Sequence, residues 1–443
     1  MAPLITWFGD DFTGSAAAME VLAFAGIETV LFSDVPSEAL MARFSGAQAV
    51  GIASTARTHG PDWMRAHLPA PLGFLHGLGA PILHYKVCST FDSSPTSGSI
   101  GTAIEVGLKV TDAQAAPMVV AAPQMRRYQA FGHLFAGNFD GVFRLDRSIM
   151  ARHPVTPMDE ADLLRHLAHQ TDLPSALIDL EALWSGPQGA LDAALAGGAR
   201  VLSIDSMEPV SEAAAGRLLW DNRDRLGFSV GSQGVEYALV RHWLEAGVIA
   251  PAPMPGSAGR VAQIAAVSGS VSPSTAQQIA WAEAHGFKAI RFDAARALQG
   301  ERAAEEIARA VKAGVEAASQ GASPLICSAT GPDDPAVAAV RAVATDMSAA
   351  NEMIGQALGE ILDGILTATG IRRAVISGGD TSGHGMRALG LSALQAIAPT
   401  IPGAGLNRAY GDGAHDSLEI ALKGGQMGSE DFFGWIRDGG GAR

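Results

Sequence analysis

The sequence predicts an α/β protein of two domains, each a largely parallel sheet flanked by helices. Short apolar runs typical of buried strands alternate with longer stretches of helical apolar spacing along the whole chain. The length of 443 residues exceeds the usual size of one domain. Residues 251–259 contain three prolines and two glycines, a composition typical of a linker. We therefore expect domains at 1–250 and 260–443.

Composition and charge exclude several classes of protein. Charged residues make up 17% of the chain and apolar residues 48%, as in globular proteins. The formal charge of -14 argues against nucleic acid as a partner. No apolar run is long enough to span a membrane, and Met1–Asp11 has no basic leader region. Cys88 and Cys327 are the only cysteines, too few for a disulfide framework or a zinc motif. A cytoplasmic protein is expected.

Two carboxylates follow the first predicted strand, Leu4–Phe8. They lie in Gly9-Asp10-Asp11-Phe12-Thr13-Gly14, just before a helix predicted at 15–25. Ligands of open α/β sheets bind at this edge, where a carboxylate can orient a hydroxyl, accept its proton or hold a metal. The alternative is that one Asp only caps the helix. A functional role for the Asp pair is favoured, because a helix cap needs only one Asp.

Cationic side chains are predicted at the same edge. A strand at 47–53 leads to Arg57, which is suited to forking onto a carboxylate, with a solvated surface role as the alternative. A strand at 81–85 leads to Lys86, followed by hydroxyl-bearing residues that offer donors to an oxyanion. Cys88 is interpreted as a packed residue rather than a nucleophile, because no base is identifiable for it. Residues 124–157 lack clear periodicity, and we expect a functional segment or an irregular flap.

The second domain offers three small-residue loops after strands. Ser377–Gly383 follows the apolar run 374–376 and precedes a helix, Ser268–Ser270 follows a strand predicted at 261–267, and Gly424–Gly428 follows one at 418–422. Glycine lets backbone N–H groups approach a ligand closely, and a helix start adds partial positive charge, which suits a phosphate. The alternative for each loop is an ordinary turn. Three such loops at one sheet edge would form a nucleotide pocket.

Several catalytic signatures are absent from the sequence. It contains no G-x-x-x-x-G-K-[ST], no G-x-G-x-x-G after a strand, no G-x-S-x-G elbow and no HExxH. What remains is a first domain with carboxylates, Arg and Lys, and a second domain with glycine-rich anion loops. A kinase that closes its substrate onto ATP-Mg²⁺ in a cleft between two domains accounts for both.

These motifs, in this order, resemble those of the four-carbon acid sugar kinases over nearly the whole chain. The resemblance rests on the motifs Gly9–Gly14, Lys86–Ser93, Ser268–Ser270, Ser377–Gly383 and Gly424–Gly428, the last followed by Glu430-Asp431-Phe432-Phe433. It implies that the first domain binds the sugar acid through Asp10, Arg57, Lys86, Val87, Cys88 and Ser89. It implies that the second binds ATP through Ser270, Gly378, Gly379, Asp380, Thr381 and Gly424. Asp10 or Asp11 would deprotonate the terminal hydroxyl, and Arg57 and Lys86 would hold the carboxylate. The metal ligands are not indicated.

Departures from the family pattern reduce the number of candidate substrates. Many members carry Lys-x-Asp-Ser-Thr-x-Arg-Gly, whereas this chain has Cys88 and Asp92 where Asp and Arg would stand. The sequence Lys86–Ser93 resembles the branch of the family that phosphorylates the 4-hydroxyl of 3-oxo-tetronate. Ser54–His59 and Pro123–Tyr128 match this branch less closely, so 3-oxo-isoapionate is an alternative, as are threonate and erythronate. A nucleotide- and sugar-acid-binding regulator without turnover is the alternative of another class, and the Asp pair argues against it. The oligomeric state is undecided, with a homodimer as one expectation.

Overall fold

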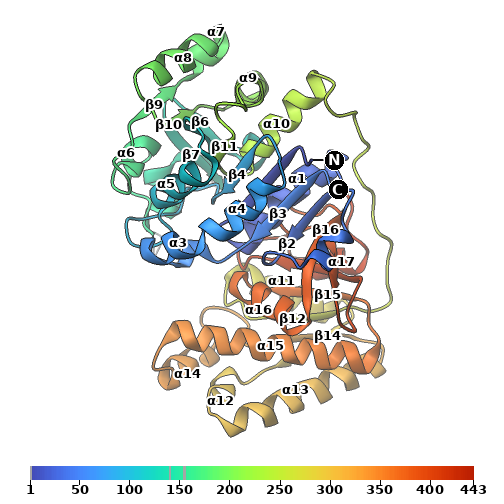
Figure 1. Cartoon of the computed structure of the whole chain (residues 1–443). Helices are drawn as coiled ribbons and strands as arrows, with labels where there is room; N and C mark the ends of the chain where they lie inside the picture. Colours follow the sequence, from blue (N-terminus) through green and yellow to red (C-terminus); the bar gives the residue numbers. More distant parts are fainter. Residues whose placement is uncertain (1, 139–140, 153–155) are drawn as a thin grey trace. The chain divides into compact units, whose positions relative to one another are not determined.

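The protein is described by a computed structural model that covers residues 2–138, 141–152 and 156–443. The chain forms two compact units, Met1–Pro253 and Met254–Arg443, and both are α/β (Figure 1). The fold class predicted from the alternation of strands and helices is therefore confirmed.

The first unit is built on a parallel sheet with the strand order β2-β3-β1-β4-β11-β5-β10-β9. The strands are β1 Ile5–Gly9, β2 Thr29–Phe32, β3 Ala49–Ala53, β4 Leu83–Lys86, β5 Ala116–Val119, β9 Ser175–Ile178, β10 Val201–Ile204 and β11 Phe228–Gly231. The helices are α1 Phe12–Phe24, α2 Glu38–Ala42, α3 Pro61–His67, α4 Pro69–Gly77, α5 Ile100–Thr111, α6 Leu163–Leu167, α7 Leu180–Ser185, α8 Gln188–Ala196, α9 Pro209–Asp221 and α10 Gly234–Glu245. Strands such as β1 and β3 are buried along their whole length, which explains their nearly continuous apolar sequences.

The segment 124–157 is more regular than the sequence indicates. It contains a small antiparallel sheet of β6 Arg127–Ala130, β7 His133–Asn138 and β8 Gly141–Arg144, while residues 139–140 and 153–155 lie outside the described residues. The turn between β6 and β7 uses Phe131 and Gly132, both at positive φ. Buried Asp205 accepts the N–H groups of these two residues at 2.6 and 3.0 Å. The interpretation as an irregular flap is therefore wrong. The sequence did not indicate these strands because each is too short to show a clear periodicity.

The second unit has a mixed sheet in the order β13-β14-β12-β15-β18-β17-β16, parallel from β13 to β18 and antiparallel beyond. The strands are β12 Ala265–Ser268, β13 Phe287–Arg291, β14 Ser323–Cys327, β15 Arg373–Ser377, β16 Leu391–Ala398, β17 Leu406–Gly411 and β18 Leu418–Lys423. The helices are α11 Pro273–Ala284, α12 Ala294–Ala297, α13 Glu301–Ser319, α14 Pro335–Val343, α15 Met347–Thr369, α16 Gly379–Ala388 and α17 Phe432–Arg437. The long helix α15 packs against both α13 and α16 (Figure 1).

One boundary differs from its prediction at the start of this unit. The strand expected at 261–267 begins only at Ala265, because the preceding residues pair with the end of the chain instead. The N–H groups of Ala258 and Val261 donate to the carbonyls of Gly439 and Arg437 at 2.8 and 3.0 Å. The core behind this pairing includes Ile264, Phe432 and Phe433 and fixes α17 against the sheet.

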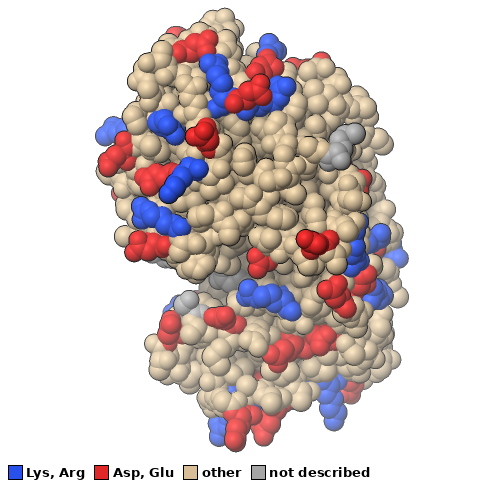
Figure 2. All heavy atoms as spheres, viewed as in Figure 1, with Lys and Arg blue, Asp and Glu red and all other residues tan. Residues whose placement is uncertain are grey.

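Charged groups of both signs are scattered over one face of the molecule (Figure 2). On the face shown in Figure 2, the acidic and basic side chains of the described residues lie singly or in small groups among uncharged ones. The described residues form no broad basic patch on that face.

Candidate active site

In the first unit, three of the residues predicted to form the site meet at the carboxyl ends of neighbouring strands. Asp10 follows β1, Lys86 ends β4, and Arg57 lies in a short 3₁₀ turn, Ala56–Thr58, after β3. Backbone hydrogen bonds tie them together: Asp10 N–H donates to the Lys86 carbonyl and Arg57 N–H to the Asp10 carbonyl, both at 3.0 Å. The order β3-β1-β4 thus brings together residues far apart in the sequence.

The Arg57 guanidinium is engaged by both carboxylates of the Asp pair. Its Nη2 lies 2.7 Å from Asp10 Oδ1 and 2.9 Å from Asp11 Oδ1, and its Nε donates to Asp10 Oδ2 at 3.2 Å. Burial alone would lower the pKa of Arg57, but the charges of Asp10 and Asp11 outweigh it and raise that pKa well above its usual value. Arg57 therefore stays a cation whose charge is already balanced within the protein.

The two carboxylates have different surroundings. Asp10 is only 2% exposed, and burial raises the pKa of its carboxyl group although Arg57 opposes this. The Asp11 side chain is 29% exposed and is the N-cap of α1, with Oδ1 accepting the Gly14 N–H at 3.0 Å. The helix accordingly starts at Phe12, earlier than predicted. Asp11 thus takes the capping role, and Asp10 is left without one.

The residues after β4 form a tightly packed segment. Lys86 is buried, its Nζ donates to the Val87 carbonyl at 2.6 Å, and a methyl group built on Gly14 would lie 2.8 Å from that Nζ. Val87 is buried and Ser89 is half-buried. Cys88 Sγ lies 3.0 Å from Thr90 Oγ1, and burial together with Asp92 raises the pKa of the thiol. A thiol held protonated agrees with a packed role rather than a nucleophilic one.

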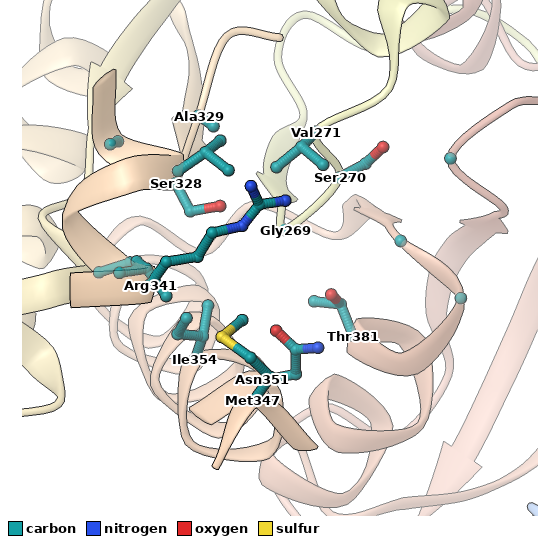
Figure 3. A pocket seen from close by; sticks show the side chains of 17 residues that line it. Gly269, Ser270, Val271, Ser328, Ala329, Arg341, Met347, Asn351, Ile354 and Thr381 are labelled. Carbon is teal, nitrogen blue, oxygen red and sulfur yellow. The ribbon is translucent and has the colours of Figure 1, made fainter. Parts of the chain in front are cut away.

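The second unit contains a cavity of about 380 Å³ at the carboxyl ends of its parallel strands (Figure 3). Its lining comprises Gly269, Ser270, Val271, Ala294, Ser328, Ala329, Ala336, Val337, Val340, Arg341, Met347, Asn351, Ile354, Gly378, Gly379, Thr381 and Gly425. The predicted residues Ser270, Gly378, Gly379 and Thr381 are among them, and the lining contains Gly425 rather than its predicted neighbour Gly424. The side chain of Asp380 lies outside what the structure describes.

Glycine is required where the three loops touch one another. A methyl group built on Gly269 would lie 2.4 Å from Thr381 Oγ1, and one on Gly425 would lie 2.6 Å from Ser270 Oγ. Gly378 adopts a φ of 132°, which favours glycine, and it precedes α16 without a side-chain cap. The first N–H groups of α16 therefore need partners from outside the helix, and a helix start of this kind is suited to an anion.

The opposite wall of the cavity is largely apolar. It is formed by α14 and α15, from which Val337, Val340 and Met347 contribute side chains. Figure 3 shows Arg341 extending from α14 into the cavity and Asn351 on the side of α15 that faces it. The cavity therefore combines an apolar wall on the helices with a glycine-rich loop at a helix start.

A buried lysine stands behind the glycine loops. Lys423, at the end of β18, is 0% exposed, and burial lowers the pKa of its amine to about 8. Its Nζ donates to the Gly424 carbonyl at 3.1 Å and to Thr275 Oγ1 at 3.3 Å. Thr275 Oγ1 in turn lies 3.0 Å from Ser270 Oγ, so the lysine is linked to the lining of the cavity.

Sequence reasoning missed this lysine and the helical wall. Met347, Asn351 and Ile354 recur at a spacing of one and two helical turns, a periodicity from which the wall could have been predicted. Lys423 carries no comparable signal, because only its burial distinguishes it. No cluster of three or more metal-ligating side chains occurs among the described residues, and no helix in that part of the chain is long and apolar enough to cross a membrane.

Comparison with known proteins assigns a class to each unit. Residues 5–239 match a family described as a sugar-binding N-terminal domain, and residues 265–433 match a nucleotide-binding C-terminal domain. The chain is 46% identical to the 3-oxo-isoapionate kinase of Paraburkholderia graminis, over 98% of this chain and 94% of the relative. It is 32% identical to the 3-oxo-tetronate kinase of Methylobacterium radiotolerans, over 97% of each.

Solved structures share the fold. A Salmonella typhimurium protein described as a putative tRNA synthase has a TM-score of 0.79 at 27% identity, with 98% of both chains covered. The Haemophilus influenzae protein HI1011 has a TM-score of 0.74 at 22% identity, with 98% of this chain and 99% of that chain covered.

A sugar-binding unit followed by a nucleotide-binding unit, in relatives named as kinases, defines a phosphotransferase that acts on a hydroxyl of a sugar acid. The chain belongs to the four-carbon acid sugar kinase family, as its motifs predict.

Proposed function

We propose that this kinase transfers the γ-phosphoryl group of ATP to the terminal, 4-hydroxyl group of 3-oxo-isoapionate in carbohydrate-acid catabolism. The observation that carries the choice of acid is the 46% identity to a 3-oxo-isoapionate kinase, against 32% to a 3-oxo-tetronate kinase over a similar length. The mismatch of Pro123–Tyr128 with the 3-oxo-tetronate branch supports the same choice. The two free thiols agree with work in the reducing cytoplasm.

In this proposal Asp10 is the general base. Burial raises the pKa of its carboxyl group, which brings it nearer to the working pH than an ordinary aspartate, and Arg57 holds both of its oxygens in place. The proton of the terminal hydroxyl moves to Asp10 as the hydroxyl oxygen bonds to the γ-phosphorus. The bond from that phosphorus to the β–γ bridging oxygen breaks, and ADP leaves. Asp11 caps α1 and helps to hold Arg57.

ATP is assigned to the cavity of the second unit. Its phosphates would lie beside Gly378 and against the N–H groups of Gly379 and the rest of the first turn of α16, and its base against the wall of α14 and α15. Arg341 extends into the same cavity and is suited to the phosphates. Mg²⁺, arriving with the phosphates, would neutralise part of their charge.

A second candidate substrate is 3-oxo-tetronate, because several relatives near 32% identity carry that name. Threonate and erythronate remain further alternatives within the same reaction class. A regulator that binds both ligands without turnover is disfavoured, because a sensor has no need for a buried carboxylate with a raised pKa.

The deciding experiment measures ADP release from ATP with each acid in turn. We expect the highest kcat/KM for 3-oxo-isoapionate, a lower value for 3-oxo-tetronate, and the lowest values for threonate and erythronate. A higher kcat/KM for 3-oxo-tetronate would overturn the choice of acid but not the reaction class. Tight binding of ATP without turnover of any acid would favour the regulator.

A further inference from the structure

The small sheet β6-β7-β8 begins at the same sheet edge as the Asp10–Arg57 pair. After β5 the chain reaches Ala122, which pairs with Arg127 in an antiparallel bridge through two hydrogen bonds of 3.0 and 3.1 Å. In the order β3-β1-β4-β11-β5, the sheet edge therefore carries Arg57, Asp10, Lys86 and finally Arg127. The backbone of Arg127 is fixed at both ends of its strand, because Asp205 holds the turn that follows it.

Among the described residues, hydrogen bonds reach the Arg127 guanidinium on one side only. Its Nη1 donates to the carbonyls of Gly137 and Met125 at 3.0 and 3.1 Å. Its Nε is buried, and among the described residues neither Nε nor Nη2 has a hydrogen-bond partner. The Nε–Nη2 edge is the one that binds a carboxylate through two parallel hydrogen bonds. Leaving a buried donor without a hydrogen-bond partner costs free energy, so a ligand that accepts from this edge would be stabilised.

The charges around Arg127 are incompletely balanced. No carboxylate of the described residues lies within ion-pair distance of it. Burial lowers the pKa of Arg127, and the nearby Cys88 and Asp92 oppose this only in part. The same Cys88 also lies close enough to Arg57 to act on its pKa, which places the thiol near both arginines.

The other two cations at this edge are already occupied. Arg57 is paired with Asp10 and Asp11, and the Lys86 ammonium is buried against the Val87 carbonyl and the first turn of α1. A substrate carboxylate brought to Arg57 would face two carboxylates that hold the same guanidinium. At Arg127 it would meet the Nε–Nη2 edge, to which no described residue is bonded.

We propose that Arg127 binds the carboxylate of the sugar acid through its Nε–Nη2 edge, and that the sheet β6-β7-β8 serves to hold this guanidinium in place. This inference rests on the proposed function, because it takes the ligand to be a sugar acid. It assigns recognition of the carboxylate to Arg127 and leaves Arg57 as the residue that positions Asp10. The acid group and the reacting hydroxyl are thereby bound by different arginines.

The test separates recognition of a carboxylate from a structural role. Binding of 3-oxo-isoapionate and of its primary carboxamide to the wild type, Arg127→Ala and Arg127→Lys is measured by calorimetry without ATP, and KM for both is measured with ATP. We expect Arg127→Ala to weaken binding of the acid about 10- to 100-fold and to leave binding of the carboxamide and KM for ATP nearly unchanged. Arg127→Lys keeps the positive charge but not the two parallel donors, so its affinity for the acid should lie between those of the wild type and Arg127→Ala.

The control is Arg126→Ala, because Arg126 is the exposed neighbour whose guanidinium donates to the Asn138 carbonyl. It should bind both compounds as the wild type does. Equal losses for acid and carboxamide in Arg127→Ala would show a structural role and overturn the inference. The wild type could also bind the acid more tightly than the carboxamide, lose this preference in Arg127→Ala, and turn over neither compound. That outcome would support the inference and contradict the proposed kinase reaction.

Discussion

The two candidate binding regions both lie at the carboxyl ends of parallel strands, but they are built from different chemical groups. The edge of the first unit carries charged side chains, with Arg57 held by Asp10 and Asp11. The cavity of the second unit carries glycines and a free helix start, with Lys423 behind them. A small acid with one carboxylate and one reacting hydroxyl needs individually placed side chains. A triphosphate needs many donors at close range, and backbone N–H groups supply these.

The largest effect that separates the two regions is expected for Asp10→Asn. Loss of the base should lower kcat about 100- to 10,000-fold while KM for ATP stays within a few-fold. Asp11→Asn is the matched control, because asparagine also caps helices, and it should cost far less. Because burial raises the pKa of Asp10, wild-type kcat/KM should fall on the acid side at a higher pH than an ordinary aspartate would give. Full turnover in Asp10→Asn, with loss in Asp11→Asn, would reverse the assignment.

Gly378→Ala should produce the largest effect confined to the second region. A methyl group there would lie 2.7 Å from Thr381 Oγ1 on a backbone with φ of 132°, so the loop must move. We expect KM for ATP to rise by about 10-fold or more, with calorimetric binding of the sugar acid unchanged. Gly379→Ala is a milder comparison, because the structure leaves room for its methyl group. Equal losses of ATP and acid binding in Gly378→Ala would contradict separate binding regions.

Lys423 should make ATP affinity depend on pH. With a pKa of about 8 in the absence of ligand, its amine is protonated below that pH, and an anion favours the protonated form. ATP affinity should therefore be full below about pH 8 and weaken as pH rises above it. Lys423→Met, of similar length and without charge, should bind ATP more weakly and with a flatter profile between pH 7 and 9. An unchanged profile in the variant would remove Lys423 from nucleotide binding.

The smallest effect is expected at the exposed wall of the cavity. Arg341→Ala should raise KM for ATP only about three- to tenfold, because an exposed cation contributes less than the buried loops. Titration of ATP, ADP and AMP measures this contribution phosphate by phosphate. A loss that is the same for AMP as for ATP would place Arg341 at the base or ribose instead.

The sequence allowed more to be predicted about the residues at strand ends than about the walls that surround them. Asp10, Arg57 and Lys86 could be predicted to meet, because parallel strands deliver their ends to one edge. Arg127 could not, because β6 is short and its position depends on the Ala122 bridge. The antiparallel β16 and β17 were not predicted either, because their apolar residues do not alternate regularly and their pairing shifts register. Lys423 is buried, and nothing in the sequence around it indicates that burial.

The proposed reaction is tested most directly by ³¹P nuclear magnetic resonance of the wild type with ATP, Mg²⁺ and 3-oxo-isoapionate. The account predicts a new phosphate-ester signal, split by two neighbouring methylene protons, that grows as the γ-phosphate signal of ATP declines. Asp10→Asn should abolish that growth. An ATP signal that stays constant while both ligands bind, or that yields only inorganic phosphate, would contradict the account.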